Sequence, residues 1–344
     1  MSPSVQRILF LADAGPLVGG GHVMRCLTLA GALRAKGAAC AFAAGDEAAK
    51  VLGAFAGPEI ERLAGSGEDA RALVQSGLVA IGDWNPTWVV VDHYEVSAEQ
   101  EGRLRQAAGR LLAIDDLRRV HDADLVLDSN FGRTEGDYPG VAALTGAAFT
   151  LIRPAFRDLR EIALMRRGVQ AGVSRVLVAM GLTDLDGITA RVLRALRPVL
   201  GDRQVDVVLG AGAVGLDQVL AMARDDRRLE IHVSTQAMSA LTAAADLAIG
   251  AGGSSTWERC CLGLPAITAV LADNQRANAA ALEAAGATVV LEAADAGFEA
   301  RLAGTFEALC GDDARLKALS AASAALCDGM GAERVAKRVL APIS

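Results

Sequence analysis

Three consecutive glycines, Gly19–Gly21, followed by His22 form the part of this 344-residue sequence best suited to chemistry. They follow an apolar run, Ile8–Ala12, that predicts a strand, and they open a pattern of apolar residues with helical spacing. Glycines let a ligand approach the backbone closely, and a helix N-terminus favours a phosphate or diphosphate. The helix dipole disfavours an imidazolium there, so we expect His22 to be neutral at pH 7 and able to act as a base. A glycine loop alone indicates a simple turn about as often as a ligand site. The histidine at the end of this loop favours a ligand site.

A second glycine-rich junction, Gly250–Glu258, follows the apolar run Leu247–Ile249 and precedes another predicted helix. Its backbone N–H groups and hydroxyls also suit an anion. Ser255 and Glu258 have the spacing of a capping box, in which the glutamate bonds back to the start of the helix. The alternative is that the Glu258 carboxylate accepts hydrogen bonds from the ribose hydroxyls of a nucleotide. The spacing alone favours the cap.

Further polar residues follow other predicted strands. Asp273–Gln275 follows Ala266–Val270, where amides could bind a sugar or phosphate, although turn formation is the simpler interpretation. Tyr94 follows the run Trp88–Asp92 and is expected to line a ligand site, and the adjacent His93 is expected to be a structural hydrogen-bonding residue.

Three more short motifs receive structural interpretations. Ser97 and Gln100 predict a capping box. The pair Asp115–Asp116 and Asp128 are interpreted as turn formers, because no residues with metal-ligand spacing accompany them. Neither His121 nor His232 is assigned a role.

Short apolar runs alternate with amphipathic helical patterns along the chain, as in parallel sheets covered on both faces. In the first half the predicted strands are Ile8–Ala12, Ala39–Ala43, Trp88–Asp92, Leu111–Ile114 and Leu125–Leu127, with a strand or bend near Phe149–Ile152. After a helical connector, 156–170, they are Arg175–Met180, Val205–Leu209, Leu229–Val233, Leu247–Ile249, Ala266–Val270 and Thr288–Leu291.

These two βα arrays predict an α/β protein with two doubly wound, Rossmann-like parallel-sheet domains facing a cleft. The expected domains are residues 1–158, which carry the His22 loop, and residues 159–326, which carry the second glycine-rich junction and to which the resemblance described below assigns UDP binding. Residues 327–344 form a C-terminal helix that could cross back to the first domain; the last helical pattern, 314–340, is broken near Gly329–Gly331.

The composition narrows the class of protein. The formal net charge is −7 and no basic stretch offsets it, which argues against a nucleic-acid partner. Six cysteines without C-x-x-C spacing indicate buried thiols in a reducing cytosol. We find no signal peptide and no run of about 18 apolar residues, so we expect a cytoplasmic protein without a membrane partner. The first loop lacks G-x-G-x-x-G, so a dinucleotide cofactor is not expected, nor is a metal.

Seven segments, in order, resemble one family: the UDP-2,4-diacetamido-2,4,6-trideoxy-β-L-altropyranose hydrolases of pseudaminic acid biosynthesis. These segments are Gly19–Ala30, Val91–Tyr94, Ile114–Leu117, His121–Asp128, Leu151–Phe156, Ala251–Cys260 and Asp328–Val335. The family is similar in fold to the GT-B glycosyltransferases, especially the enzyme that adds N-acetylglucosamine to lipid I. The resemblance implies a UDP-sugar substrate, metal-independent attack of water on the anomeric carbon, inversion there and departure of UDP. Such a step serves surface or flagellin glycosylation.

The resemblance also implies roles for individual residues. His22 would be the general base, and Asn274 and Tyr94 would position water or sugar. Glu258 would hold the ribose, which reverses the preference for a cap, and Arg153 would pair with the nucleotide. The diphosphate would face Ser254, Ser255 and Thr256. The remaining substrate-binding positions would be Asp13, Gly20, Gly21, Arg25, Gly253 and Gln275.

The chain departs from the family pattern in two places. Residues 180–184 read Met-Gly-Leu-Thr-Asp where members often have Gly-Gly-Ser-Asp, and Gln100-Glu101 replaces Trp-Glu. Both departures concern the choice of sugar, and the sequence leaves pseudaminic and legionaminic precursors as alternatives. A GT-B glycosyltransferase using a UDP-sugar is the alternative reaction, and a non-catalytic nucleotide-sugar-binding module is a third interpretation that would not need His22.

Overall fold

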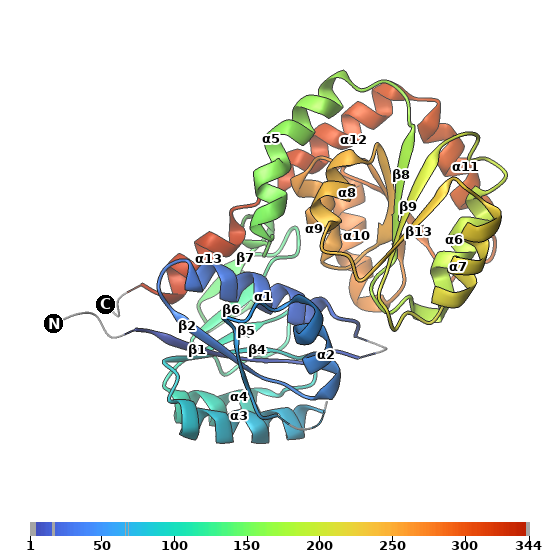
Figure 1. Ribbon diagram of the computed structural model, residues 1–344. Helices are drawn as coiled ribbons and strands as arrows, with labels where there is room; N and C mark the ends of the chain where they lie inside the picture. The colour runs from blue at the N-terminus through green and yellow to red at the C-terminus, as the bar shows by residue number, and fades with distance from the viewer. Residues whose placement is uncertain (1–4, 16–17, 66, 68, 342–344) are drawn as a thin grey trace. The chain divides into compact units, whose positions relative to one another are not determined.

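The computed structural model describes residues 5–15, 18–65, 67 and 69–341 (Figure 1). The chain forms two compact units. Unit 1 runs up to Leu151 and takes up the chain again from Met330, and unit 2 comprises Ile152–Gly329. The outer limits predicted for the domains, residues 1 and 344, lie outside the described residues.

Unit 1 is built on a seven-stranded parallel sheet. Its strands are β1 (Arg7–Ala12), β2 (Ala39–Ala43), β3 (Glu61–Leu63), β4 (Trp88–Asp92), β5 (Leu111–Ile114), β6 (Leu125–Asp128) and β7 (Ala143–Thr145). Its helices are α1 (Gly21–Arg34), α2 (Asp46–Phe55), α3 (Ala70–Trp84), α4 (Ala98–Ala108) and α13 (Gly331–Val339), with short 3-10 turns at Glu135–Asp137 and Ala147–Phe149.

The strand order in unit 1 is β3-β2-β1-β4-β5-β6-β7. The order reverses between β1 and β4, which pair in register from Ile8 with Trp88 to Ala12 with Asp92. In doubly wound sheets ligands bind outside the carboxyl ends of the strands at such a reversal. The residues that follow β1 and β4 are therefore the ones positioned for chemistry in this unit.

Unit 2 repeats the architecture with a six-stranded parallel sheet. Its strands are β8 (Arg175–Ala179), β9 (Gln204–Leu209), β10 (Leu229–Val233), β11 (Leu247–Ala251), β12 (Ala266–Val270) and β13 (Val289–Glu292). Its helices are α5 (Pro154–Val169), α6 (Ile188–Leu196), α7 (Leu216–Asp225), α8 (Met238–Ala244), α9 (Ser255–Cys261), α10 (Asp273–Ala284), α11 (Phe298–Cys310) and α12 (Asp313–Leu326), with a 3-10 turn at Leu185–Gly187. The order, β10-β9-β8-β11-β12-β13, reverses between β8 and β11.

The predicted fold class is confirmed: both sheets are parallel and doubly wound. Continuous apolar strands are buried on both faces because helices cover both sides of each sheet, as Figure 1 shows. In unit 1, side chains of α1 and α13 pack on one face with Phe10 and Phe42, and those of α3 and α4 pack on the other. The prediction of a strand or bend near Phe149–Ile152 is confirmed as a bend, because the chain passes through a 3-10 turn, Ala147–Phe149, and forms no strand at residues 150–152.

Helix α13 completes the core of unit 1. Val335, Ala336 and Val339 are fully buried against α1 and the sheet. The first residue of the helix, Gly331, lies very close to the backbone of Phe149 and Thr150. A Cβ atom on Gly331 would be 2.2 Å from the carbonyl oxygen of Thr150. Only glycine fits there without moving main-chain atoms.

Substituting Gly331→Ala should therefore lower the free energy of unfolding of unit 1 by about 1–3 kcal/mol. The added methyl group would clash with main-chain atoms, which cannot move aside as a flexible side chain could. Urea unfolding followed by circular dichroism measures this. Gly53→Ala is the matched control: Gly53 lies in α2 of the same unit, where an added Cβ atom would meet no described atom within 4 Å. Equal stability of both variants would contradict this packing.

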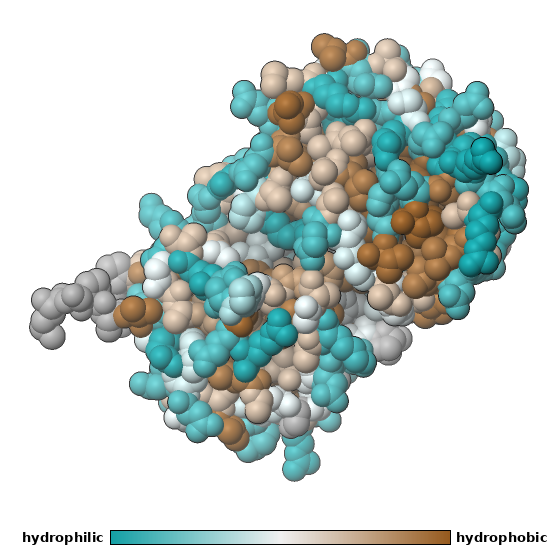
Figure 2. Space-filling view, in the orientation of Figure 1, coloured by the Kyte–Doolittle hydropathy of each residue, from teal (hydrophilic) through white to brown (hydrophobic). Residues whose placement is uncertain are grey.

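No described helix is long and apolar enough to cross a membrane. Figure 2 shows hydrophilic residues over much of the surface of each unit in this view, with hydrophobic residues gathered in one area of unit 2.

Candidate functional site

The loop after β1 delivers His22 to the strand reversal of unit 1. Gly15 and Gly19 exchange two backbone hydrogen bonds, at 3.2 and 2.7 Å, and Gly19 has φ +75°, a conformation that favours glycine. Helix α1 then begins at Gly21 with Gly20 as its N-cap. His22 accordingly lies in the first turn of a helix, as the sequence predicts.

Asp13 and His22 form a close buried pair. The Nδ1 atom of His22 lies 2.6 Å from Oδ1 of Asp13, and both side chains are more than nine-tenths buried. Burial opposes ionisation of Asp13, but the hydrogen bond and charge of His22 outweigh it and lower the pKa of the carboxyl. An ionised carboxylate only accepts hydrogen bonds, so the proton of a neutral His22 lies on Nδ1 and its Nε2 lone pair is available to accept one.

This pair was not predicted from the sequence, which assigned Asp13 to substrate contact. The structure gives Asp13 a partner within the protein. The carboxylate also faces Nε2 of His93 at 3.6 Å, and His93 Nδ1 accepts the backbone N–H of Glu95. The structural role predicted for His93 is confirmed by that bond.

Arg25 is held by carboxylates. Its Nε and Nη2 atoms donate to both oxygens of Asp92 at 2.6 Å, and Nη1 donates to Asp116 at 2.8 Å. The fully buried Asp92 lies 3.8 Å from His22 Nδ1. In this structure Arg25 therefore fixes the surroundings of His22, and the substrate contact predicted for it stays a prediction.

Tyr94 lies beside His22. The two rings meet edge to face with centroids 4.6 Å apart, and the Tyr94 hydroxyl donates to Asp116 at 3.0 Å. Asp116 thus links Tyr94 to Arg25, which links to Asp92. The structure brings together the two residues of unit 1 that were predicted to be catalytic, His22 and Tyr94.

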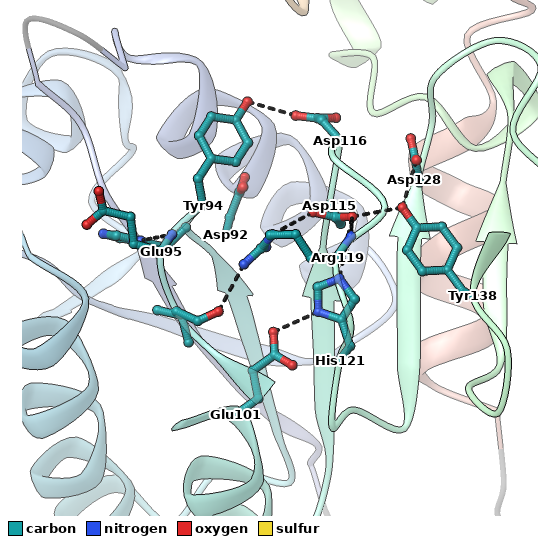
Figure 3. Close-up of polar contacts among 12 residues, drawn as sticks. Asp92, Tyr94, Glu95, Glu101, Asp115, Asp116, Arg119, His121, Asp128 and Tyr138 are labelled. Atoms are coloured by element: carbon teal, nitrogen blue, oxygen red, sulfur yellow. Dashed lines mark hydrogen bonds and ion pairs between the residues drawn. The ribbon is translucent and has the colours of Figure 1, made fainter. Parts of the chain in front are cut away.

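A buried polar network surrounds Asp115, the residue before Asp116, as Figure 3 shows. Asp115 accepts hydrogen bonds from Arg119 and from the Tyr138 hydroxyl, which also lies 2.8 Å from Asp128. Burial raises the pKa of Asp128, whereas the nearby His121 ring and the hydrogen bonds from Arg119 overcome burial and lower the pKa of Asp115. The network fixes the chain that carries Asp116.

His121 is the cationic member of that network. Its Nδ1 atom lies 2.8 Å from Glu101, and its Nε2 atom lies 3.5 Å from Asp115. Burial works against the charged ring, but hydrogen bonds and charges of Asp115 and Glu101 raise the pKa of His121 from 6.5 to about 9. The sequence assigned His121 no role, because Glu101 is 20 residues away.

This raised pKa predicts a pH-dependent stability. A histidine whose pKa is higher in the folded chain stabilises the fold fully below pH 6.5, and that contribution is lost as the pH rises through about 9. The loss should reach about 3 kcal/mol. Urea unfolding of the protein and of His121→Asn across this range measures it. If the difference in unfolding free energy between the two proteins did not change with pH, His121 would not carry the charge.

In unit 2 the loop after β11 presents hydroxyl groups at the strand reversal. Ser254 is exposed, Ser255 is half-buried and Thr256 is buried. The Thr256 hydroxyl bonds to Ala251 O at 3.3 Å and accepts from Arg259 at 2.9 Å. In this structure the Thr256 hydroxyl therefore fixes the loop, and the contacts of Ser254, Ser255 and Thr256 with a diphosphate stay predictions. A Cβ atom added to Gly253 would meet no described atom within 4 Å, so the loop is open at that position.

The capping box that the spacing of Ser255 and Glu258 favours when taken alone is not formed. Helix α9 has seven residues, its N-cap is Ser254, and no described side chain caps it. Glu258 instead accepts hydrogen bonds from Arg153, with Nη2 at 2.8 Å and Nε at 3.1 Å, both to Oε1. Burial raises the pKa of Glu258, although the charge of Arg153 works in the opposite direction. Because both bonds use Oε1, Oε2 can accept from a ligand.

The remaining predicted residues of unit 2, Asn274 and Gln275, lie at the start of helix α10. Asn274 is exposed in the first turn of α10, and the side-chain oxygen of Gln275 accepts the Leu271 N–H at 3.0 Å. In the loop after β8, Asp184 is fully buried with φ +51° and accepts the backbone N–H and hydroxyl of Thr189. That loop is held internally at one of the two places where the sequence departs from the pattern of the family that it resembles.

One group of described side chains has the spacing of metal ligands. Oxygen and nitrogen atoms of Asp206, Glu230 and His232, on β9 and β10, all lie within 4.8 Å of one another. Arg175 already donates to both oxygens of Asp206, at 2.5 and 2.7 Å. A guanidinium thus provides the positive charge in this cluster.

Comparison with known proteins gives two kinds of match. Residues 188–339 match the glycosyltransferase family 28 C-terminal domain. The chain is 27% identical over 148 residues to the spore coat polysaccharide biosynthesis protein SpsG of Bacillus subtilis, covering 42% of each chain. It is 33% identical over 173 residues to the UDP-N-acetylglucosamine–N-acetylmuramyl-(pentapeptide) pyrophosphoryl-undecaprenol N-acetylglucosamine transferase of Salinibacter ruber, covering 48% of this chain and 46% of that one. Less than half the length of each relative is therefore matched.

The crystal structure of MurG from Acinetobacter baumannii matches along nearly the whole chain. It covers 97% of this chain and 99% of that one, with a TM-score of 0.69 and 16% identity. The fold is GT-B-like. The match to the family 28 domain, residues 188–339, includes the loop that carries Glu258. It does not include the loop that carries His22.

Proposed function

We propose that this protein is a metal-independent hydrolase of the nucleotide-sugar UDP-2,4-diacetamido-2,4,6-trideoxy-β-L-altropyranose. It would release UDP and the free sugar with inversion, as a step of pseudaminic acid biosynthesis. The observation that supports this proposal most is the buried Asp13–His22 pair, 2.6 Å apart, at the strand reversal of a GT-B-like fold. The pair has the form of a base oriented by a carboxylate.

In the proposed reaction, His22 Nε2 takes a proton from water as the water oxygen attacks the anomeric carbon. The bond from that carbon to the β-phosphate oxygen breaks, and its electron pair leaves with UDP. Asp13 keeps Nδ1 protonated and stabilises the imidazolium that forms. Tyr94, beside the His22 ring, orients the water or sugar, and Asn274 contributes an amide.

Unit 2 is proposed to bind the UDP group. Glu258 Oε2 would accept from the ribose hydroxyls while Arg153 holds Oε1. Ser254 and Ser255 would donate to the diphosphate. The match of residues 188–339 to a glycosyltransferase C-terminal domain supports this assignment, and so does the UDP-sugar in the name of the Salinibacter relative.

The same matches favour a second candidate, a glycosyltransferase that moves a sugar from UDP to an acceptor. The two activities differ in the group that attacks the anomeric carbon. A transferase needs the acceptor hydroxyl, whereas a hydrolase uses water alone.

Proton NMR of the purified protein with the UDP-sugar, in EDTA and without acceptor, separates the two. We expect prompt appearance of UDP and free sugar. If the nucleotide-sugar stays intact until an acceptor is added, the protein is a transferase. If UDP binds but this sugar is never released, the proposed substrate is wrong.

A further inference from the structure

Arg259 is a buried cation in unit 2 to which neither the sequence analysis nor the proposed reaction assigned a function. It lies in α9, one residue after Glu258, and is 3% exposed. Among the described residues no carboxylate lies within ion-pair distance of its guanidinium. Buried charges are normally paired, so an arginine in this setting is unusual.

The guanidinium is directed at the hydroxyl loop. Nη2 donates to Ala251 O at 3.0 Å and to the Thr256 hydroxyl at 2.9 Å, and Nη1 donates to the Ser255 hydroxyl at 3.3 Å. Its Nε atom is buried with no hydrogen-bond partner in the described part of the chain. No described carboxylate therefore pairs directly with this side chain, although the charge of Glu258 acts on it from a longer distance, and the described residues do not satisfy all of its hydrogen bonds.

The strand beside it is shaped to admit this side chain. A Cβ atom on Gly250 would lie 2.5 Å from Arg259 Nη1 and 3.0 Å from its central carbon. Glycine at this position of β11 lets the guanidinium approach the backbone closely at the carboxyl end of the strand. Burial lowers the pKa of Arg259 to about 10, so the side chain is still charged at pH 7.

The hydrogen bond to Ser255 has a consequence for ligand binding. Because the Ser255 oxygen accepts from Arg259, its own hydrogen is left to donate to a ligand. A donor hydroxyl backed by a buried positive charge is suited to a strongly anionic group, which would supply the missing counter-charge.

We infer that Arg259 is a positioning residue for the diphosphate of a bound nucleotide, because it orients the Ser255 hydroxyl and supplies the positive charge that the diphosphate neutralises. This inference rests on the proposed function for the identity of the ligand. It predicts that the effect of Arg259 grows with the charge of the ligand and is absent for an uncharged nucleoside.

Titration calorimetry with UDP, and ligand-observed NMR with uridine, tests this on the full chain. Arg259→Met should weaken UDP binding by about 10–100-fold and leave uridine binding unchanged. Arg259→Lys, which restores the charge, should recover most of the loss. Gly250→Ala, which displaces the guanidinium, should weaken UDP binding as Arg259→Met does.

Arg167 offers a matched control in the same unit. It is 6% exposed and, among the residues described, it too has no carboxylate within ion-pair distance, but it donates only to the backbone carbonyls of Thr242, Ala245 and Leu262. Arg167→Met should lower thermal stability without changing UDP affinity. UDP binding by Arg259→Met within twofold of the unchanged protein would overturn the inference. An equal loss of uridine and UDP binding would do so too, since it indicates a structural role.

Inorganic pyrophosphate separates this inference from the proposed function. If the unchanged protein binds pyrophosphate in an Arg259-dependent way but shows no preference for UDP, Arg259 has the inferred role and the nucleotide is wrong. If it binds neither ligand, both proposals fail.

Discussion

Replacing His22 with asparagine should lower the rate of UDP release from the nucleotide-sugar by about 10²–10⁴-fold, the usual contribution of a general base. Asparagine can still donate to Asp13 from nearly the position of Nδ1, but it has no atom that takes a proton from water. The UDP contacts proposed above lie in unit 2, so the affinity for UDP should stay close to that of the unchanged protein. Single-turnover NMR and calorimetry measure the two quantities.

The chain contains a matched histidine for this experiment. His232 is also paired with a carboxylate, Asp206 in unit 2, through a 2.8 Å contact, but through Nε2, whereas His22 contacts Asp13 through Nδ1. His232→Asn should leave the rate of UDP release unchanged. A His22→Asn protein that is folded, binds UDP and releases it at the original rate would remove His22 from the reaction.

The substitution Asp13→Asn should lower the rate by about 10²–10³-fold through the tautomer of His22. The asparagine amide would donate to Nδ1, so the ring proton would move to Nε2, the atom that must accept a proton from water. Nothing in this change touches the residues proposed to bind UDP. The rate of UDP release should therefore fall while the affinity for UDP stays unchanged.

The double variant, Asp13→Asn with His22→Asn, tests whether the two residues act as a unit. Once His22 is gone, Asp13 has no ring to orient, so the double variant should be no slower than His22→Asn. Multiplicative losses would show that Asp13 acts on the substrate directly, as the sequence analysis expected.

The fold could be predicted because most of its strands can be recognised from the apolar pattern of their own residues. The bounds of Ala39–Ala43, Trp88–Asp92 and Ala266–Val270 agree with β2, β4 and β12, since strands buried on both faces are continuous apolar runs. The strands that were missed, β3 and β7, have three residues each, and β3 is the polar edge strand Glu-Arg-Leu. Such segments are defined by their neighbour in the sheet and not by their own pattern.

The site was predictable only in part, because its partners are distant in sequence. The glycine loop placed His22 at a helix start, which the structure confirms. Spacing suggested a cap for Glu258, but the pairing residue, Arg153, is 105 positions away. Arg259 could not be distinguished from any surface arginine until its burial and its missing counter-charge among the described residues were visible.

The central claim is that water attacks the anomeric carbon of a UDP-sugar with His22 as the base. Running the reaction in ¹⁸O-labelled water and recording the mass of the released UDP tests it most directly, because phosphate oxygens do not exchange with solvent on this timescale. Attack at carbon predicts UDP without label, formed with no acceptor present. Label in the UDP would mean that the phosphorus–oxygen bond breaks instead, which would contradict the account.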